Sequence, residues 1–115
     1  RRRQNAQSYL EYIETDDVFV PREKEYEFNT YHTFVIQVEK RNELKEFLLK
    51  QGIEAAIHYP TPIHLQPAAK RLGYKLGDFP IAEKQAGMIL TLPVNQSLGQ
   101  SEIGRICVSV NEHYS

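Results

Sequence analysis

Apolar positions recur with the period of an α-helix along much of this chain. Ala6, Tyr9, Leu10 and Ile13 form the first stripe, and the polar turn formers of residues 15–17 would end that helix. Comparable stripes follow further along the chain. Together they predict helices over residues 6–13, 42–51, 79–89 and 100–113, with a shorter helix at residues 67–72.

Alternating apolar residues predict strands between these helices. Residues 31–38 are the clearest case, because Phe34, Ile36 and Val38 share one face while the other face carries further β-branched and aromatic residues. Shorter strands are expected at residues 53–57 and 90–92. The succession of strand, helix and strand up to residue 57 is close to a minimal crossover, which predicts a small α/β domain.

Four residues carry signals for helix ends. Asn42 is a suitable N-cap for the second helix, and Gly52 stands where a left-handed residue commonly ends one. Gly99 is expected at the N-cap of the last helix, with Glu102 as the carboxylate half of a capping box.

The segment from His58 to Pro67 combines three prolines with two histidines and a tyrosine. Neither a helix nor an interior strand tolerates so much proline, so this segment is expected to be a stiff loop. One interpretation is that the loop presents His58, Tyr59 and His64 as binding groups. The alternative is a purely structural loop whose histidines satisfy nearby backbone groups.

Composition narrows the classes of protein that this chain can represent. Its 115 residues suffice for one domain, and 14 basic against 15 acidic side chains argue against a general nucleic-acid binder. No apolar run could span a membrane and no signal peptide is visible, so a cytoplasmic protein is expected. The only methionine is Met88, which favours a processed chain or a piece of a longer protein.

Other residues that could carry chemistry have simpler interpretations. Cys107 lies on the apolar stripe of the last helix and is expected to be a buried structural residue, not a nucleophile. The arginines at positions 1–3 are expected to form a solvated helix end in preference to a phosphate site. His58 and His64 lack the spacing of a metal pair on a helix, so no metal site is expected.

One stretch resembles a known family. Residues 52–67 read GIEAAIHYPTPIHLQP and are similar to the signature of the DegT/DnrJ/StrS nucleotide-sugar aminotransferases, which depend on pyridoxal 5'-phosphate (PLP). The resemblance is to the C-terminal small domain of the aspartate aminotransferase fold and covers essentially the whole chain. Further runs that fit are residues 31–36, 41–44, 72–74, 77–80, 82–83 and 90–93.

This resemblance implies a fold and a site. The fold would be a short sheet of about three strands packed with helices, with residues 1–30 as helix and connection from the large domain and residues 31–115 as the small domain. His58, Tyr59 and His64 would bind the substrate from the cleft side, and Pro60 and Pro62 would fix the shape of the loop. The intact enzyme would use PLP and an amino donor to aminate a nucleotide-linked keto-deoxysugar, for cell-surface polysaccharides or secondary metabolites.

The same resemblance implies that the chain is inactive by itself. In this family the large domain carries the lysine that forms the Schiff base, and none of the seven lysines here lies in a similar motif. No catalytic residue and no bound cofactor are therefore expected in this chain. Self-association or a homodimer is expected, because the surface meant for the large domain is bare. The alternative is a regulatory or interaction protein of the same family, without catalysis; nucleic acid and membranes are not expected partners.

Overall fold

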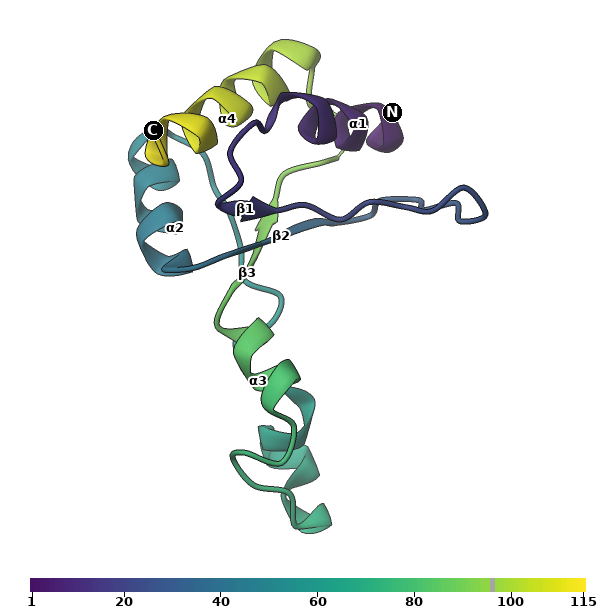
Figure 1. Ribbon diagram of the computed structural model, residues 1–115, viewed down its shortest axis with the longest axis vertical. Coiled ribbons are helices and arrows are strands. Elements are labelled where there is room, and N and C mark those ends of the chain that lie inside the picture. Colours follow the sequence, from purple (N-terminus) through teal and green to yellow (C-terminus); the bar gives the residue numbers. More distant parts are fainter. Residues whose placement is uncertain (96) are drawn as a thin grey trace.

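The computed structural model describes residues 1–95 and 97–115, and it has a body and an arm (Figure 1). The body contains the sheet and three α-helices, and the arm, formed by residues 59–87, extends away from it and gives the molecule extents of 47 × 35 × 25 Å. Its elements, in chain order, are α1 (Arg2–Tyr12), β1 (Val18–Phe19), β2 (Phe34–Val38), α2 (Arg41–Lys50), the 3₁₀ helices η1 (Ile63–Leu65) and η2 (Pro67–Leu72), α3 (Pro80–Ala86), β3 (Ile89–Leu92) and α4 (Gln100–His113).

The body is built on antiparallel strands in the order β1-β2-β3. On one face of the sheet Phe34 lies opposite Leu92, and both side chains are buried. On the other face Val35 lies opposite Thr91, since successive residues of a strand point to opposite sides. The alternation predicted for residues 31–38 is confirmed, although the strand itself begins at Phe34.

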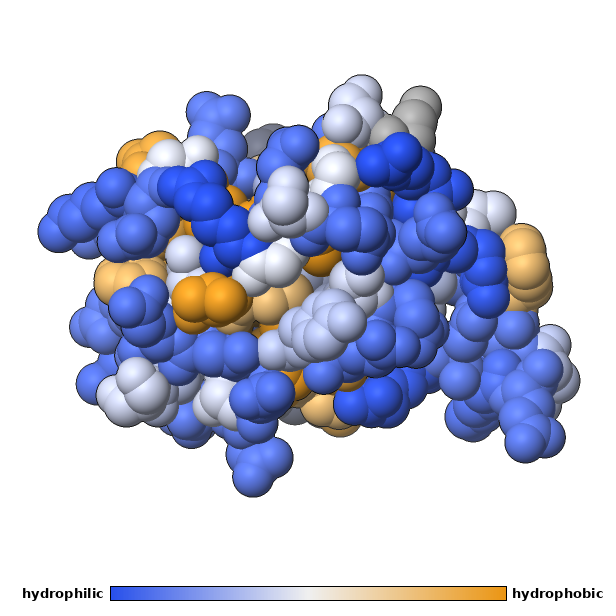
Figure 2. All heavy atoms as spheres, turned by 90° about the horizontal axis from the view of Figure 1, so that it is seen from above, coloured by the Kyte–Doolittle hydropathy of each residue, from blue (hydrophilic) through white to orange (hydrophobic). Residues whose placement is uncertain are grey.

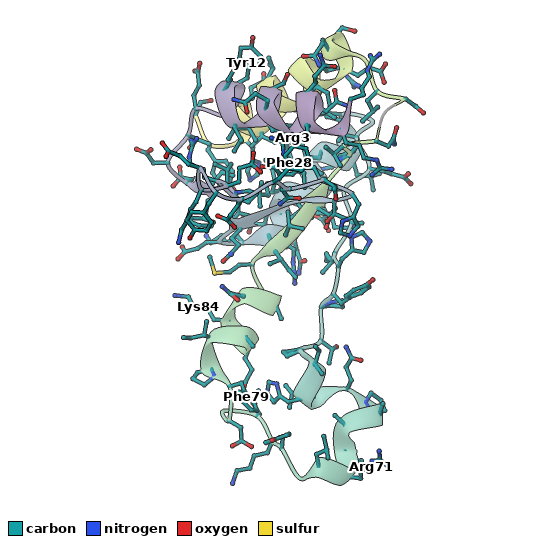
Figure 3. All side chains as sticks on the ribbon, turned by 90° about the vertical axis from the view of Figure 1, so that its right-hand side faces the viewer. Arg3, Tyr12, Phe28, Arg71, Phe79 and Lys84 are labelled. Carbon is teal, nitrogen blue, oxygen red and sulfur yellow. The ribbon has the colours of Figure 1, made fainter. Side chains whose placement is uncertain are left out.

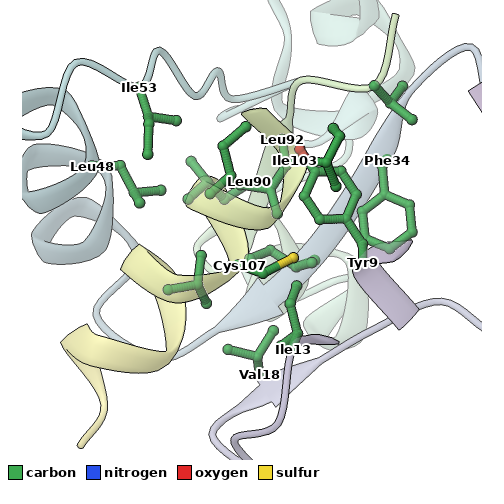
Figure 4. Close-up of a cluster of buried hydrophobic side chains, with 14 of the residues drawn as sticks. Tyr9, Ile13, Val18, Phe34, Leu48, Ile53, Leu90, Leu92, Ile103 and Cys107 are labelled. Carbon is green, nitrogen blue, oxygen red and sulfur yellow. The ribbon is translucent and has the colours of Figure 1, made fainter. Parts of the chain in front are cut away.

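Helices α1, α2 and α4 supply the apolar side chains that close the core (Figure 4). Tyr9 of α1 is fully buried, and its ring centre lies 4.8 Å from that of Phe34 on β2. The Tyr9 hydroxyl donates a hydrogen bond to the carbonyl of Pro93. Cys107 of α4 is also buried, as predicted, and burial raises the pKa of its thiol to about 12, which keeps it protonated and unreactive.

The strand predicted at residues 53–57 is wrong. Only Ala56 pairs with a strand, through a single bridge to Thr91 of β3. The backbone of Ile53 belongs instead to the end of α2, where its N–H donates to the carbonyl of Leu48 beyond Gly52, which has the predicted left-handed conformation (φ 82°). Since Ala56 and β2 both run antiparallel to β3, they are parallel to each other, with β3 between them.

The N-cap predicted for α2 is also wrong. Lys40 caps the helix in a left-handed conformation (φ 52°), because the chain turns directly from the end of β2 into α2. Asn42 lies inside the first turn, and its side-chain oxygen accepts a hydrogen bond from Arg41 Nε at 3.0 Å. At α4 the prediction is confirmed, since the N–H of Gly99 donates to Glu102 Oε1 at 3.3 Å.

The helix predicted at residues 79–89 is shorter than expected, and its apolar stripe is mostly not buried. α3 ends at Ala86, because Ile89 already begins β3. Of the stripe Ala86 is buried, whereas Phe79 remains 44% exposed. The apolar stripe of α3 therefore faces the rest of the arm and not the core of the body. The helix at residues 67–72 is present as η2, with 3₁₀ geometry.

The opening arginines lie at the surface, as expected of a solvated helix end, and they also contact neighbouring segments. The Arg3 guanidinium pairs with Glu23 at 2.7 Å, donates to the carbonyl of Asn29, and lies 4.0 Å from the ring centre of Phe28 (Figure 3). Arg1 donates to the carbonyl of Leu98. These bonds tie the start of α1 to the long connection before β2 and to the segment before α4.

Residues 1–30 pack as part of the body. α1 lies against α4, and Ala6 has no exposed surface. The domain division at residue 30 stays a prediction. Seen from the end that carries α1 and α4, the surface is mostly hydrophilic, with scattered apolar side chains (Figure 2). Within residues 1–95 and 97–115, every helix is too short or too polar to span a lipid bilayer.

Candidate active site

His58 stands where the chain leaves the sheet and enters the arm. Ala56, two residues earlier, is held by Thr91 of β3 through the bridge. The imidazole Nδ1 of His58 lies 3.0 Å from Thr91 Oγ1, and the ring meets that of Tyr59 edge to face. Thr91 of the sheet thus engages Nδ1 of His58, while the residue as a whole remains exposed.

His58 lines a hollow of about 540 Å³ on the body. Its walls come from the start of α1, the segment after α2, the end of β3 and α4, and they carry charges of both signs. Arg2 and Arg105 lie on this hollow together with Glu54 and Glu102. A hollow of this size and polarity suits a polar small molecule.

Tyr59 and His64 line a different hollow, of about 520 Å³, inside the arm. This second hollow lies between η1, η2 and α3, and its lining is mostly apolar, with Ile63, Leu72 and Phe79 among its residues (Figure 3). Tyr59 and His64 therefore share this hollow, whereas His58 lines the hollow on the body, although its ring contacts that of Tyr59.

His64 is already engaged inside the arm. It is 8% exposed, and its Nε2 lies 2.9 Å from Glu83 Oε2. The same carboxylate accepts hydrogen bonds from the N–H groups of Gly77 at 2.8 Å and Phe79 at 3.1 Å. Glu83 thus connects α3 to η1 and to the turn before α3, and one nitrogen of His64 serves this structural network.

The role of Glu83 was not predicted from the sequence. A signal was present, because Pro80 marks the first turn of a helix and an acidic residue soon after it can bond the free N–H groups there. The contact with His64 joins residues 19 positions apart, so it depends on how η1 packs against α3. No spacing along the chain indicates it.

Replacing Glu83 by glutamine is expected to loosen the arm. The N–H of Gly77, as the largest cause, and then those of Phe79 and the His64 ring lower the pKa of the Glu83 carboxyl below 4.5. The stability that this carboxylate contributes is therefore fully present above pH 4.5 and is lost as the pH falls through the lower folded pKa. Hydrogen exchange of the Gly77 and Phe79 amides, measured by NMR as protection factors, should show this acid-dependent loss.

In Glu83→Gln those protection factors should be low already at neutral pH and should show little further change with acid. Glu25→Gln, which changes an exposed carboxylate outside the arm, is the matched control. Unchanged protection of Gly77 and Phe79 in Glu83→Gln would contradict the structural role of Glu83.

Arg41 attaches the arm to the body and was likewise missed. Its side chain is 8% exposed, and its guanidinium donates to the carbonyls of Ala86 at 2.8 Å and Ile89 at 3.0 Å. Ala86 is the last residue of α3, where free carbonyls and the helix dipole favour a cation. An arginine at the start of α2 therefore holds the end of α3 and the start of β3.

The residues around these hollows do not fit PLP by themselves. Within residues 1–95 and 97–115, no lysine lines either the hollow of His58 or that of His64. A Schiff base needs a lysine beside the cofactor, so no reaction step through PLP follows from this chain's own residues. In the same described part, no group of three or more His, Cys, Asp or Glu side chains is placed to hold a metal ion.

The antiparallel sheet packed with helices, with a histidine at the sheet edge between body and arm, defines the small domain of a sugar aminotransferase fold. One solved neighbour, DesV of S. venezuelae in complex with a ketimine intermediate, matches with a TM-score of 0.93 and 31% identity over 98% of this chain. The model of the DegT/DnrJ/EryC1/StrS aminotransferase family matches residues 1–111. The chain belongs to this family, whose members depend on PLP.

Curated relatives carry both enzyme and regulator names. A "pleiotropic regulatory protein" of Geobacillus stearothermophilus is 37% identical over 99% of the chain. The dTDP-3-amino-3,6-dideoxy-α-D-galactopyranose transaminase of Aneurinibacillus thermoaerophilus is 31% identical over 98%. The chain spans only about a third of their lengths, 32% and 31% respectively.

Proposed function

We propose that this chain forms one wall of the substrate cleft of a PLP-dependent nucleotide-sugar aminotransferase. The observation that carries this proposal is the family match over residues 1–111. The hollow at His58 supports it, because a mixed-charge surface of about 540 Å³ suits a polar ligand such as a sugar nucleotide. The reaction itself would transfer an amino group to a nucleotide-linked keto-sugar, with PLP held by residues outside the hollows described above.

His58 and Tyr59 are the substrate-side groups in this proposal. His58 is exposed, its Nε2 has no hydrogen-bond partner among the described residues, and Tyr59 is 68% exposed beside it. His64 remains a predicted contact through Nδ1 alone, since Glu83 lies on its other nitrogen. The arm also exposes Ile63, which is 82% accessible, and this supports the predicted self-association with a second copy. A cytoplasmic location stays a prediction.

Titration of the 15N-labelled chain with UDP-N-acetylglucosamine and dTDP-glucose tests the proposed site. The expected result is weak binding that shifts the NMR signals of Ile57, His58, Tyr59 and Thr91. In His58→Ala the dissociation constant should rise about fivefold, as expected for the loss of one hydrogen bond. His113→Ala, at the far end of α4, is the matched control and should bind as the unchanged chain does.

NMR shifts confined to residues outside the His58 hollow would contradict the proposal.

A regulatory function is the second candidate, favoured by the name of the Geobacillus stearothermophilus relative. A regulatory function predicts binding to DNA and not to the sugar nucleotides, so a short DNA duplex is titrated in parallel. Binding of the duplex at the arginines of α1, without any effect of the sugar nucleotides, would favour the regulator.

A further inference from the structure

Thr91 of β3 holds His58 from the neighbouring strand. Thr91 and Ala56 exchange both backbone hydrogen bonds, from Thr91 N–H to Ala56 O at 2.7 Å and from Ala56 N–H to Thr91 O at 3.0 Å. Side chains of directly paired residues project to the same face of a sheet. His58 follows Ala56 by two residues and therefore returns to that face, diagonally across from Thr91.

Thr91 lies on the face of β3 opposite to that of Leu90 and Leu92, and it is only 8% exposed. Its hydroxyl lies 3.0 Å from His58 Nδ1. Among the described residues this is the single side-chain partner of the Thr91 hydroxyl and of the His58 ring nitrogens. The hydroxyl carries one hydrogen, and Nδ1 is its available acceptor.

Two tautomers of neutral His58 fit the distance, but they differ in what they leave unpaired. If Nδ1 carried the proton and donated to the hydroxyl oxygen, the hydroxyl hydrogen of Thr91, a residue only 8% exposed, would have no acceptor among the described residues. Leaving a buried donor unpaired is unfavourable. If the hydroxyl donates to Nδ1, both groups are satisfied, and the imidazole proton resides on Nε2.

We propose that Thr91 is a positioning residue that fixes neutral His58 as the Nε2–H tautomer, so that the ring presents a hydrogen-bond donor to the ligand. As a statement about ligand binding, this rests on the proposed function of the His58 hollow. The donor would bind an acceptor oxygen of the ligand, whether a ketone, hydroxyl or phosphate oxygen. An Nε2 that already carries a proton does not accept one, so His58 binds an oxygen and does not act as a base through Nε2.

The tautomer is measured directly by 15N NMR of the histidine ring nitrogens, in the ligand-free 115-residue chain at a pH where the imidazole is neutral. The expected result is an Nε2–H form of His58 that exceeds the Nδ1–H form by more than about tenfold, as one buried hydrogen bond provides. Thr91→Val keeps the branched shape but removes the hydroxyl, and it should shift the ratio at least severalfold towards that of free histidine. Thr91→Ser should restore it.

The ring of His32 is exposed and serves as the internal control, which neither substitution should change. An Nδ1–H form of His58 in the unchanged chain would overturn the inference, even if Thr91→Val failed to fold. An identical tautomer ratio in folded Thr91→Val would overturn it too. Because no ligand is present, these results do not depend on the proposed function, which the sugar-nucleotide titration tests separately.

Discussion

Truncation of Tyr9 to alanine is expected to reduce the free energy of unfolding by about 3–5 kcal/mol, as for other buried aromatic residues. The side chain has no exposed surface, packs against Phe34 of the sheet and bonds the carbonyl of Pro93. Its loss leaves a cavity between α1 and β2 and an unpaired carbonyl. Urea denaturation followed by circular dichroism measures the change.

Tyr12 lies on the same helix but is 52% exposed, so Tyr12→Ala is the matched control and should change stability by about 0.5 kcal/mol or less. The comparison of Tyr9→Ala with Tyr12→Ala also tests the predicted domain division at residue 30. If Tyr9→Ala were as mild as Tyr12→Ala, α1 would be an attachment to the small domain and not a part of its core.

Replacement of Arg41 by methionine is expected to reduce stability by about 2–3 kcal/mol, because two carbonyls lose a charged hydrogen-bond donor. Those carbonyls belong to Ala86 and Ile89, at the end of α3 and the start of β3. The arm should therefore become mobile before the body unfolds. Hydrogen exchange in α3, compared with that in α4, measures this difference. Denaturation gives the total loss in the free energy of unfolding.

Arg71 provides the control for Arg41, since it is an exposed arginine in the arm. Arg71→Met should leave both the unfolding free energy and the exchange of α3 nearly unchanged. Equal exchange in α3 and α4 of Arg41→Met would show that Arg41 stabilises the molecule as a whole, and would contradict its role at the base of the arm.

The sequence by itself predicted the helices of the body and the central strand well. Periods of 3.6 and 2 report which side of an element faces the core, and the buried faces of β2 and α4 follow them. Residues 53–57 show where such reasoning fails. An apolar run looks the same whether it forms a strand or ends a helix, and the hydrogen bond from Ile53 to Leu48 decided between them.

The segment with two histidines was also singled out from the sequence, although the 3₁₀ helix η1 forms within the loop expected there, and the family to which the chain belongs is confirmed. Only the tertiary structure decided that these histidines have different surroundings. His58 is held by Thr91, 33 positions away, and His64 by Glu83, 19 positions away. Local patterns determine which residues are presented together on a loop. The partner of each ring comes from a distant segment. The packing of β3 and α3 therefore determines which nitrogen of each ring is engaged and which remains available.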